Sequence, residues 1–390
     1  MDFSLDEETR MIKETIHDWA QEKALPRAKE IDANREFPTD LVMELGQLGF
    51  LAPYIPEEYG GAGLTYTQTA IVGEEIVRAE AGLATIMGAH NSLACYPIIA
   101  YGTEEQKQKY LPKMATGEYL GSFGLTEPDA GSDASNIKTT AILSEDKTHY
   151  VVNGHKQWIT NGDMASVIIL LAMTDKSKGL MGITPLIIEK GMEGFATGHI
   201  EDTMGIRGSH QTELFFENVK VPVANVVGGS KNVGRGFLIA MDTLDGGRIG
   251  MGIGAVGIAH QALHEALEYA KTRVQFGKAI TEFQATQWKF ADYSTQIQAA
   301  RWLVMHAAWL RDNKKKCTRE AAQAKMYASD IAVQVCLEAI QIMGGYGYSK
   351  EYPAERHLRD AKIKQIYEGT NEIQRIVIAR DVIRKGLFEL

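Results

Sequence analysis

The chain has 390 residues with a net charge of −9 at pH 7, and 45% of its residues are apolar and 23% charged. This length and composition can supply the cores of two or three domains, and the acidic balance argues against nucleic-acid binding through phosphate contacts. No apolar run reaches the roughly eighteen residues of a membrane-spanning helix.

The cysteines and the first residues indicate the compartment. Cys95, Cys317 and Cys336 have no CxxC spacing and no nearby histidine cluster, so we expect neither a disulfide framework nor a zinc site, and no metal is predicted. The acidic start MDFSLDEETR lacks the apolar segment of a signal peptide. We therefore expect the bacterial cytoplasm or, for a processed form, the mitochondrial matrix.

The first 120 residues are expected to form a helical domain. Apolar residues recur at helical spacing in segments 5–19, 41–48 and 67–78, and Pro26 interrupts the first pattern. Segment 84–102 is almost wholly apolar, which predicts one helix buried on most sides.

Between residues 121 and 235 the pattern changes to that of strands. Segments 167–173, 183–189 and 212–221 are β-branched or aromatic runs bounded by turn residues. The dipeptide Asn153-Gly154 predicts the tip of a β-hairpin within residues 149–160. We expect an antiparallel sheet in this domain.

From residue 236 to residue 390 the helical period returns. Apolar stripes in segments 253–267, 288–310, 321–344 and 372–386 have short connections, which is typical of a helix bundle. Strands and helices do not alternate regularly, so a Rossmann sheet is a poor fit and the chain reads as α+β.

Two glycine- and polar-rich stretches interrupt the strand region. FGLTEPDAGSD (123–133) offers the hydroxyls of Thr126 and Ser132 and a backbone that glycines leave open, which suits the edge of a heteroaromatic ring; a plain turn is the alternative. KQWITNG (156–162) contains Trp158, which either stacks on a ring system or packs in the core.

Two more stretches interrupt the helical region. In TRVQFGKAI (272–280), Arg273 either pairs with a pyrophosphate or caps a helix C-terminus. Gly344-Gly345 either ends a helix or admits a phosphate. None of the four stretches contains a GxGxxG, Walker, GxSxG or HExxH pattern.

The stretch IYEGTNEIQR places Glu368 on a glycine-flanked bend. Thr370 or Asn371 is a suitable N-cap for the apolar-periodic helix that follows. Glu368 therefore lies just outside that helix, either as a surface charge or as a base that points into a pocket.

Taken together, these stretches resemble the acyl-CoA dehydrogenase family over essentially the whole chain. The matching segments, in the family's order and spacing, are PEEYGG, FGLTEPDAGSD, NGHKQWITNG, GIRGS, LDGGRIG, RVQFGKAI, AKMYAS, QIMGGYGY, ERHLRDAKI and IYEGTNEIQR. Within the family the chain is most similar to the short-chain, butyryl-type branch, as HNSL (90–93) also indicates.

The resemblance implies a fold and a cofactor. The fold has an N-terminal α-helical domain (1–120), a middle β-barrel-like domain (121–235) and a C-terminal four-helix bundle (236–390), usually in a homotetramer. FAD is bound noncovalently, with some contacts from a neighbouring subunit. The implied cofactor-binding residues are Phe123, Leu125, Thr126, Gly131, Ser132, Trp158, Ile159, Thr160, Arg273, Gln275, Phe276, Gln284, Gln341, Gly344, Gly345, Thr370 and Glu372.

The resemblance also implies the reaction. A base removes the Cα proton of an acyl-CoA, a hydride passes from Cβ to the flavin, and the electrons go to electron-transfer flavoprotein. Glu368 matches the base position, and burial is expected to raise its pKa. The family's other base position is Gly247 here, which cannot serve. The implied substrate-binding residues are Ser132, Asp245, Arg248, Tyr367 and Gly369.

Two alternatives to this reading stay open, namely an acyl-CoA oxidase that uses oxygen and a non-catalytic scaffold that binds CoA or flavin. The acyl group is a further question. The adjacent Gly246 and Gly247 suggest a pocket for a short, branched or alicyclic acyl group. No arginine occurs within 84–97, so a glutaryl-type dicarboxylate lacks a counter-charge from that helix, and His90 either packs or shapes the pocket.

Overall fold

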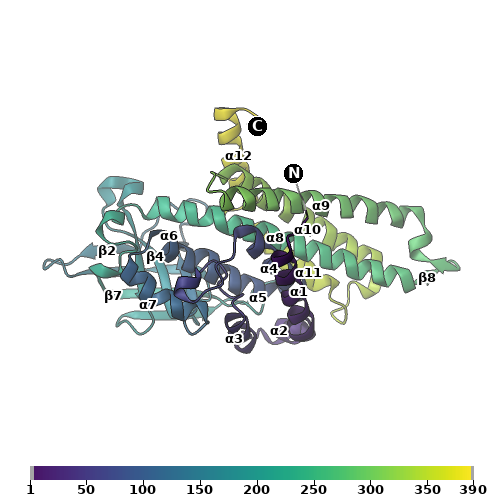
Figure 1. Cartoon of the computed structure of the whole chain (residues 1–390), viewed down its shortest axis with the longest axis horizontal. Coiled ribbons are helices and arrows are strands. Elements are labelled where there is room, and N and C mark those ends of the chain that lie inside the picture. The colour runs from purple at the N-terminus through teal and green to yellow at the C-terminus, as the bar shows by residue number, and fades with distance from the viewer. Residues whose placement is uncertain (1–3, 388–390) are drawn as a thin grey trace.

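The computed structural model describes residues 4–387, which form three regions (Figure 1). Strands gather at one end of an elongated molecule, long helices extend to the other end, and the N-terminal helices lie against both. This arrangement confirms the predicted α+β fold.

Seven α-helices form the N-terminal region. They are α1 (Glu7–Trp19), α2 (Ala28–Asn34), α3 (Thr39–Gln47), α4 (Tyr66–Ala79), α5 (Ala81–Gly88), α6 (Tyr96–Tyr101) and α7 (Glu104–Ala115). The side chains of Asp6, Thr65 and Thr103 accept backbone hydrogen bonds at the starts of α1, α4 and α7, which satisfies donors that a helix start leaves unpaired.

The helix expected over 84–102 is present and largely buried, although its winding changes partway along. A π-helical segment, η4 (Ala89–Cys95), separates α5 from α6. Its wider turns carry one extra residue each, an arrangement that often occurs at functional sites. Within it, His90 Nδ1 accepts the Gly121 N–H at 2.8 Å, and Nε2 donates to the Met114 carbonyl at 2.9 Å. Burial lowers the pKa of His90 to about 4, so this histidine is a neutral packing residue.

The middle region is a seven-stranded sheet. Its strands are β1 (Gly121–Gly124), β2 (Thr140–Leu143), β3 (His149–Thr160), β4 (Val167–Met173), β5 (Ile183–Glu189), β6 (Phe195–Ile200) and β7 (Gln211–Pro222). The order is β1-β4-β2-β3-β7-β6, and β5 also pairs with β4. The expected antiparallel pairing holds for most neighbours, whereas β4 pairs in parallel with β1 and β2.

The hairpin expected at Asn153-Gly154 is wrong, because β3 continues through both residues. Asn153 Oδ1 accepts the N–H of Asn218 on β7 at 2.8 Å, next to an irregularity in the β3–β7 register. Gly154 lets the strand approach Thr139 closely, since an added Cβ would lie 2.6 Å from the Thr139 Cβ. The chain reverses between β2 and β3 instead, where Lys147 has a left-handed φ of 58°.

The C-terminal region is a helix bundle, as predicted. It comprises α8 (Gly236–Thr272), α9 (Gln284–Asp312), α10 (Thr318–Met343), α11 (Ala354–Ile363) and α12 (Asn371–Lys385), with a small hairpin of β8 (Val274–Gln275) and β9 (Lys278–Ala279). The 37 residues of α8 span about 55 Å, so this helix connects the sheet to the far end of the bundle. Helix α12 projects from the body of the molecule (Figure 1).

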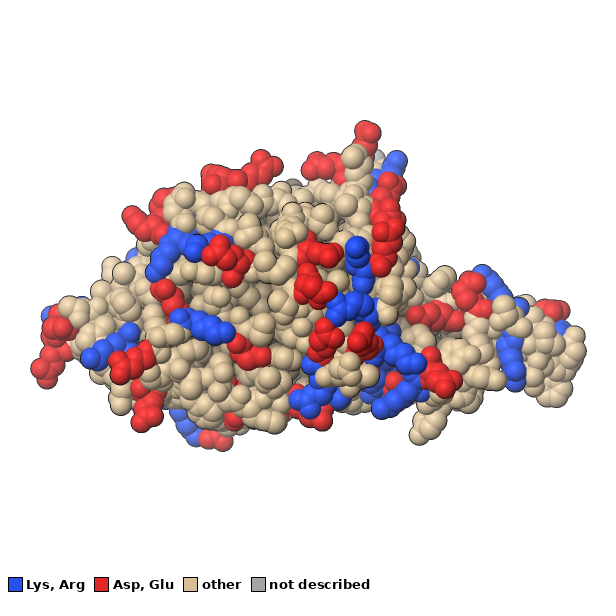
Figure 2. All heavy atoms as spheres, turned by 90° about the horizontal axis from the view of Figure 1, so that it is seen from below, with Lys and Arg blue, Asp and Glu red and all other residues tan. Residues whose placement is uncertain are grey.

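Charged side chains of both signs are mixed on the surface. Figure 2 shows acidic and basic side chains mixed over one face, without a uniform basic field. Within residues 4–387, no helix is both long and apolar enough to cross a bilayer.

Candidate active site

Glu368 lies on a sharp bend between α11 and α12. Glu368 and Gly369 have left-handed φ angles of 54° and 92°, and Thr370 then caps α12 as predicted, accepting the Ile373 N–H at 3.4 Å. A left-handed glutamate is an outlier of the kind that clusters at functional sites, because surrounding structure must hold it in place.

Three side chains from three helices hold the backbone of this bend. Gln374 Nε2 donates to the carbonyls of Glu368 at 3.2 Å and Gly369 at 2.7 Å, and Lys325 Nζ donates to Gly369 at 2.9 Å. Arg248 Nε reaches the Glu368 carbonyl at 3.5 Å. The main chain is therefore fixed from α8, α10 and α12, while the Glu368 carboxylate is left out of these hydrogen bonds.

The Glu368 carboxylate lies against the face of α8 at Gly247. Its Oε2 is buried and has no hydrogen-bond partner among residues 4–387. A Cβ added at Gly247 would lie 2.9 Å from Glu368 Cδ, so only glycine leaves room for the carboxylate there. Burial raises the pKa of Glu368 to about 7, against the opposing effect of Arg248, Lys325 and Lys364. A buried carboxylate that titrates near neutral pH and has no partner is suited to abstract a proton.

The predicted substrate residues Asp245 and Arg248 pair with each other on α8. Arg248 Nη1 lies 2.7 Å from Asp245 Oδ1, and Thr318 Oγ1 donates to Asp245 Oδ2 at 2.5 Å. Burial raises the pKa of Asp245, with Arg248 opposing it. The ion pair with Asp245 thus positions Arg248 beside the bend that carries Glu368.

The two predicted segments of the sheet domain lie next to each other. The Gln157 N–H donates to the Thr126 carbonyl at 3.0 Å, which joins segment 123–132 to segment 158–160. Leu125 is buried, Phe123 and Thr126 are half-buried, and Gly131 and Ser132 are exposed. An added Cβ at Gly131 would meet nothing within 4 Å, so the backbone edge of this loop is open to a ligand.

Trp158 does not pack in the core, so that alternative is wrong. A register shift in β3 between Lys156 and Ile159 gives Trp158 a φ of 61° and leaves its side chain 53% exposed. Ile159 is buried instead, and Thr160 Oγ1 donates to Gln211 Oε1 at 2.6 Å. The bulge therefore presents an indole at the surface beside the 123–132 loop.

Helix α8 brings this loop close to Glu368. Leu125 packs in a cluster with Ala240, and Leu244 packs against the same cluster. Gly247, which faces Glu368, lies three to seven residues further along α8, or about 5–10 Å in helical rise. The sheet segments and the glutamate therefore meet at one short stretch of this helix.

The remaining predicted cofactor residues lie at the opposite end of the bundle. These residues are Arg273, Gln275, Phe276, Gln284, Gln341, Gly344 and Gly345. About 33 residues of α8 separate Ala240 from Arg273, which corresponds to about 50 Å. One chain does not bring this distal group to Glu368. Thr370 and Glu372 lie instead at the start of α12, directly after the bend that carries Glu368.

The distal group is exposed. Phe276 and Gly277 both have positive φ, 52° and 80°, as a two-residue hairpin turn requires, and Phe276 is 95% exposed. Arg273 ends α8, with its guanidinium carbon 5.7 Å from the Tyr346 ring centre, and Gly344 ends α10 with φ 60°. Arg273 and Gly344 thus both lie at helix ends, as one of the two interpretations predicted. The exposed surface around them remains available to another molecule.

Comparison with known proteins identifies the class. Models of the N-terminal, middle and C-terminal domains of acyl-CoA dehydrogenase match residues 6–118, 122–219 and 234–383. The chain belongs to the acyl-CoA dehydrogenase family.

Individual relatives indicate the branch. The short-chain-specific acyl-CoA dehydrogenase of Clostridium acetobutylicum is 46% identical over 98% of this chain and 100% of its own length. The structure of butyryl-CoA dehydrogenase from Megasphaera elsdenii is 47% identical, with a TM-score of 0.96 over 98% of this chain and 100% of that one. A chain in the structure of the electron transferring flavoprotein of Acidaminococcus fermentans is 48% identical, with a TM-score of 0.96 over 99% and 100%.

These findings confirm the predicted family, its short-chain branch, and an oxidoreductase that uses FAD as cofactor. The residues present fit this group. Exposed Trp158 and the open backbone at Gly131 and Ser132 offer a stacking surface and donors for a flavin ring. The exposed Arg273 offers a fork for a pyrophosphate.

Sequence reasoning missed the residues that brace the site. Lys156 Nζ forms a buried ion pair with Glu127 at 2.7 Å and donates to the Leu125 carbonyl at 3.0 Å, which fixes the 123–132 loop. Lys325 and Gln374 were equally missed. The one available signal was a lysine on an otherwise apolar helix face, as at Lys325 in AAQAKMYAS.

Proposed function

We propose that the chain oxidises a short acyl-CoA to the 2-enoyl-CoA, with Glu368 as the base that takes the Cα proton. The observation that supports this most directly is the buried, unpartnered Oε2 over Gly247, on a carboxyl whose pKa is about 7. At and above that pH a large share of Glu368 is ionised and ready to accept a proton.

The carboxylate of Glu368 and the cofactor together account for the proton and the hydride that leave the acyl group. Bound FAD supplies the acceptor for the hydride that leaves Cβ with its electron pair. The Cα–H electrons form the new double bond, and the proton stays on Glu368. Negative charge that develops on the thioester oxygen needs fixed donors. No described residue accepts a hydrogen bond from the Glu368 N–H, so this group is available to donate to that oxygen.

We further propose that the cofactor site is completed by a second copy of the chain in a homotetramer. The proposed contacts from one copy are Phe123, Leu125, Thr126, Gly131, Ser132 and Trp158 to Thr160. The distal group of Arg273, Gln275, Phe276, Gln284, Gln341, Gly344 and Gly345 lies too far along α8 to join them in the same chain. Exposed apolar side chains, such as Phe276 and Trp288, also favour contact between copies.

Two finer predictions, the domain boundaries and a widened acyl pocket, are supported to different degrees. Domain boundaries near residues 120 and 235 remain our proposal, and they fall between α7 and β1 and between β7 and α8. A pocket widened for a branched or alicyclic group is less favoured. Gly246 faces Tyr66, with an added Cβ 3.4 Å from its ring, and the space at Gly247 is taken by Glu368.

Electron-transfer flavoprotein is the proposed electron acceptor, and the relation to the Acidaminococcus fermentans structure supports it. Molecular oxygen, as in an acyl-CoA oxidase, is the alternative. Anaerobically reduced enzyme would be mixed with each acceptor in turn. Fast reoxidation by oxygen with stoichiometric peroxide would decide for the oxidase.

The test of the catalytic proposal is an anaerobic titration of the FAD-loaded protein with butyryl-CoA. We expect the wild type to bleach and Glu368→Gln, with the same FAD content, to bleach about 10²- to 10⁴-fold more slowly. Unchanged bleaching in Glu368→Gln would remove Glu368 from the mechanism.

A further inference from the structure

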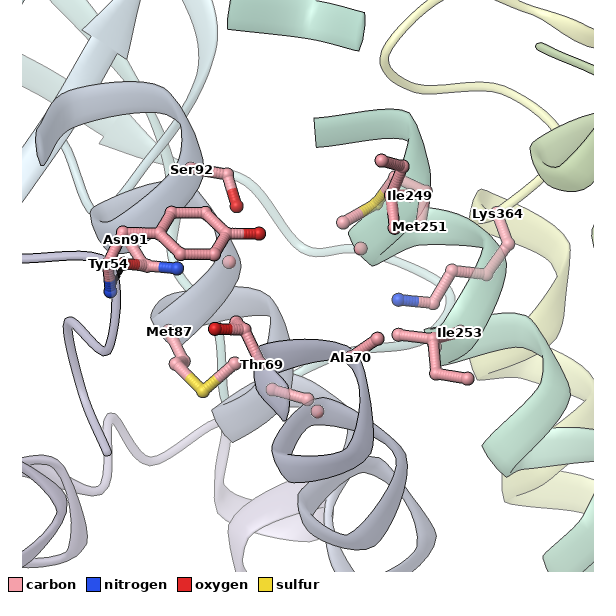
Figure 3. A pocket seen from close by; sticks show the side chains of 15 residues that line it. Tyr54, Thr69, Ala70, Met87, Asn91, Ser92, Ile249, Met251, Ile253 and Lys364 are labelled. Carbon is pink, nitrogen blue, oxygen red and sulfur yellow. Dashed lines mark hydrogen bonds between the residues drawn. The ribbon is translucent and has the colours of Figure 1, made fainter. Parts of the chain in front are cut away.

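A small internal cavity lies beside the proposed acyl site. It occupies about 30 Å³ between the N-terminal helices and α8, next to the stretch of α8 that follows Gly247 (Figure 3). Its polar lining comes from Tyr54, Thr69, Asn91, Ser92 and Lys364. The volume holds about two water-sized groups, so the cavity suits a small polar group better than a ring.

Lys364 is the one charged side chain of this lining. The residue is 1% exposed and lies just after α11, and its nitrogen points into the cavity (Figure 3). An added Cβ at Gly254 would lie 2.9 Å from Lys364 Nζ, so the ammonium rests on α8 as the Glu368 carboxylate does.

The Lys364 ammonium has no charged partner within the part of the chain that the structure describes. Nζ forms no hydrogen bond or ion pair with residues 4–387, and it makes a cation–π contact with the Tyr367 ring, whose centre is 5.3 Å away. Glu368 and Asp360 are the acids that act on it, and both lie beyond ion-pair distance. Burying an unpaired ammonium is costly, which makes a partner from outside the chain favourable.

The neighbouring polar groups are also able to donate. Asn91 Oδ1 accepts the Tyr54 N–H at 3.1 Å, and its buried Nδ2 has no hydrogen-bond partner among the described residues. The buried Thr69 hydroxyl has no partner either. The hydroxyls of Tyr54 and Ser92 point toward the same space (Figure 3). No aspartate or glutamate among residues 4–387 lines the cavity, so the lining is complementary to a ligand that accepts hydrogen bonds.

The cavity and the base lie along one face of α8. Gly247 contacts Glu368, Gly250 lies opposite Ser92, and Gly254 contacts Lys364. Seven residues from Gly247 to Gly254 correspond to about 10 Å of helical rise. With bonds of about 1.5 Å, a short carbon chain whose Cα lies at Glu368 extends toward Lys364.

We propose that this cavity receives the far end of the acyl group, and that the preferred substrate is a short dicarboxylic acyl-CoA whose free carboxylate binds Lys364. This inference rests on the proposed function. Sequence reasoning considered a counter-charge only from segment 84–97, whereas the structure supplies one from the turn after α11. Lys364 would then determine specificity without taking part in proton removal.

The test compares matched ligands. Succinyl-, glutaryl- and adipyl-CoA would each be paired with the linear acyl-CoA of equal carbon number, so that a methyl replaces the carboxylate. Binding would be measured by calorimetry in the FAD-loaded Glu368→Gln background, and oxidation by anaerobic flavin bleaching in the otherwise wild-type enzyme.

Lys364→Met is the test variant and Lys362→Met the control, because Lys362 is exposed and two residues away. We expect at least one dicarboxylic ligand to bind about 10- to 100-fold more tightly than its matched partner, as a charge-assisted pair allows. Lys364→Met should lose this preference and Lys362→Met should keep it. If Lys364→Met does not load FAD, Lys364→Gln would replace it.

Three outcomes separate this inference from the proposed function. A wild type that oxidises linear acyl-CoAs and rejects every dicarboxylic partner would overturn the inference and leave the dehydrogenase intact, as would a preference that survives in Lys364→Met. Binding that depends on Lys364 without any flavin bleaching would support the inference and refute the proposed reaction.

Discussion

Gly247→Ala is expected to separate catalysis from folding. The new methyl would lie 2.9 Å from Glu368 Cδ and 3.1 Å from Oε1, below the range of ordinary carbon contacts, and it would crowd Oε2 more closely still. The obstructing atoms are the end of a flexible side chain, so the carboxylate can rotate away while α8 stays in place. Alanine is also about 1 kcal/mol more favourable than glycine within a helix.

The expected result follows from these two effects. The melting temperature of Gly247→Ala should stay the same or rise, whereas displacement of the base should slow anaerobic flavin reduction about 10²-fold or more. Stopped-flow absorbance measures the rate and calorimetry the melting temperature, both on protein of equal FAD content.

Gly246→Ala is the matched control, since its methyl would meet the Tyr66 ring at an ordinary 3.4 Å. It should gain similar helix stability and keep its rate. A Gly247→Ala enzyme at full rate, or an equal loss in both variants, would show that the Glu368 carboxylate does not act from above Gly247.

Three further predictions concern titration, loop bracing and assembly. Because the pKa of Glu368 is raised to about 7, flavin reduction should increase as pH rises through 7 and then level off. The folded state binds this proton more tightly than the unfolded chain, so Glu368 lowers the stability of the protein as pH rises from about 4.5 to 7. Glu368→Gln should therefore raise the melting temperature at pH 8 but not at pH 4. An equal gain at both pH values would contradict this. Lys156→Met leaves Glu127 buried without its lysine partner and should lower the free energy of unfolding in urea by about 3–5 kcal/mol. The double variant with Glu127→Leu should recover much of this free energy. Equal losses in the single and double variants would mean that the pair is not coupled. Phe276→Asp should reduce both oligomer mass in light scattering and FAD retention, and a flavin-loaded assembly of unchanged mass would rule out a role for this face.

The sequence was most informative where local chemistry decides the structure. Apolar spacing predicted the helices of the first and last regions, and glycine beside Glu368 predicted its bend before α12. The Asn153-Gly154 prediction failed because the interaction that decides it is distant in sequence. Asn153 bonds to Asn218 of β7, which keeps β3 extended where the dipeptide alone favours a turn.

The candidate site shows the same limit. Trp158 is exposed because β3 bulges against β7, and no local pattern distinguishes that position from a core tryptophan. Lys362 and Lys364 are nearly indistinguishable in AKIKQIY, yet one is exposed and the other buried in a cavity. The packing of α11 against α8, which places Lys364 against Gly254, makes this difference, and it depends on tertiary contacts.

The pKa values of Glu368 and Lys364 are shifted in opposite directions, which bears on how the site uses its two charges. Burial raises the pKa of the acid to about 7 and lowers that of the lysine to about 8, although attraction between them acts in the reverse direction on each. Desolvation therefore outweighs their mutual attraction, which means that the chain holds two opposite charges in its interior without letting them pair. Gly247 and Gly254 enforce this separation by seating each group on its own turn of α8. A ligand with a carboxylate would pair with Lys364, and transfer of its Cα proton to Glu368 would neutralise the buried acid.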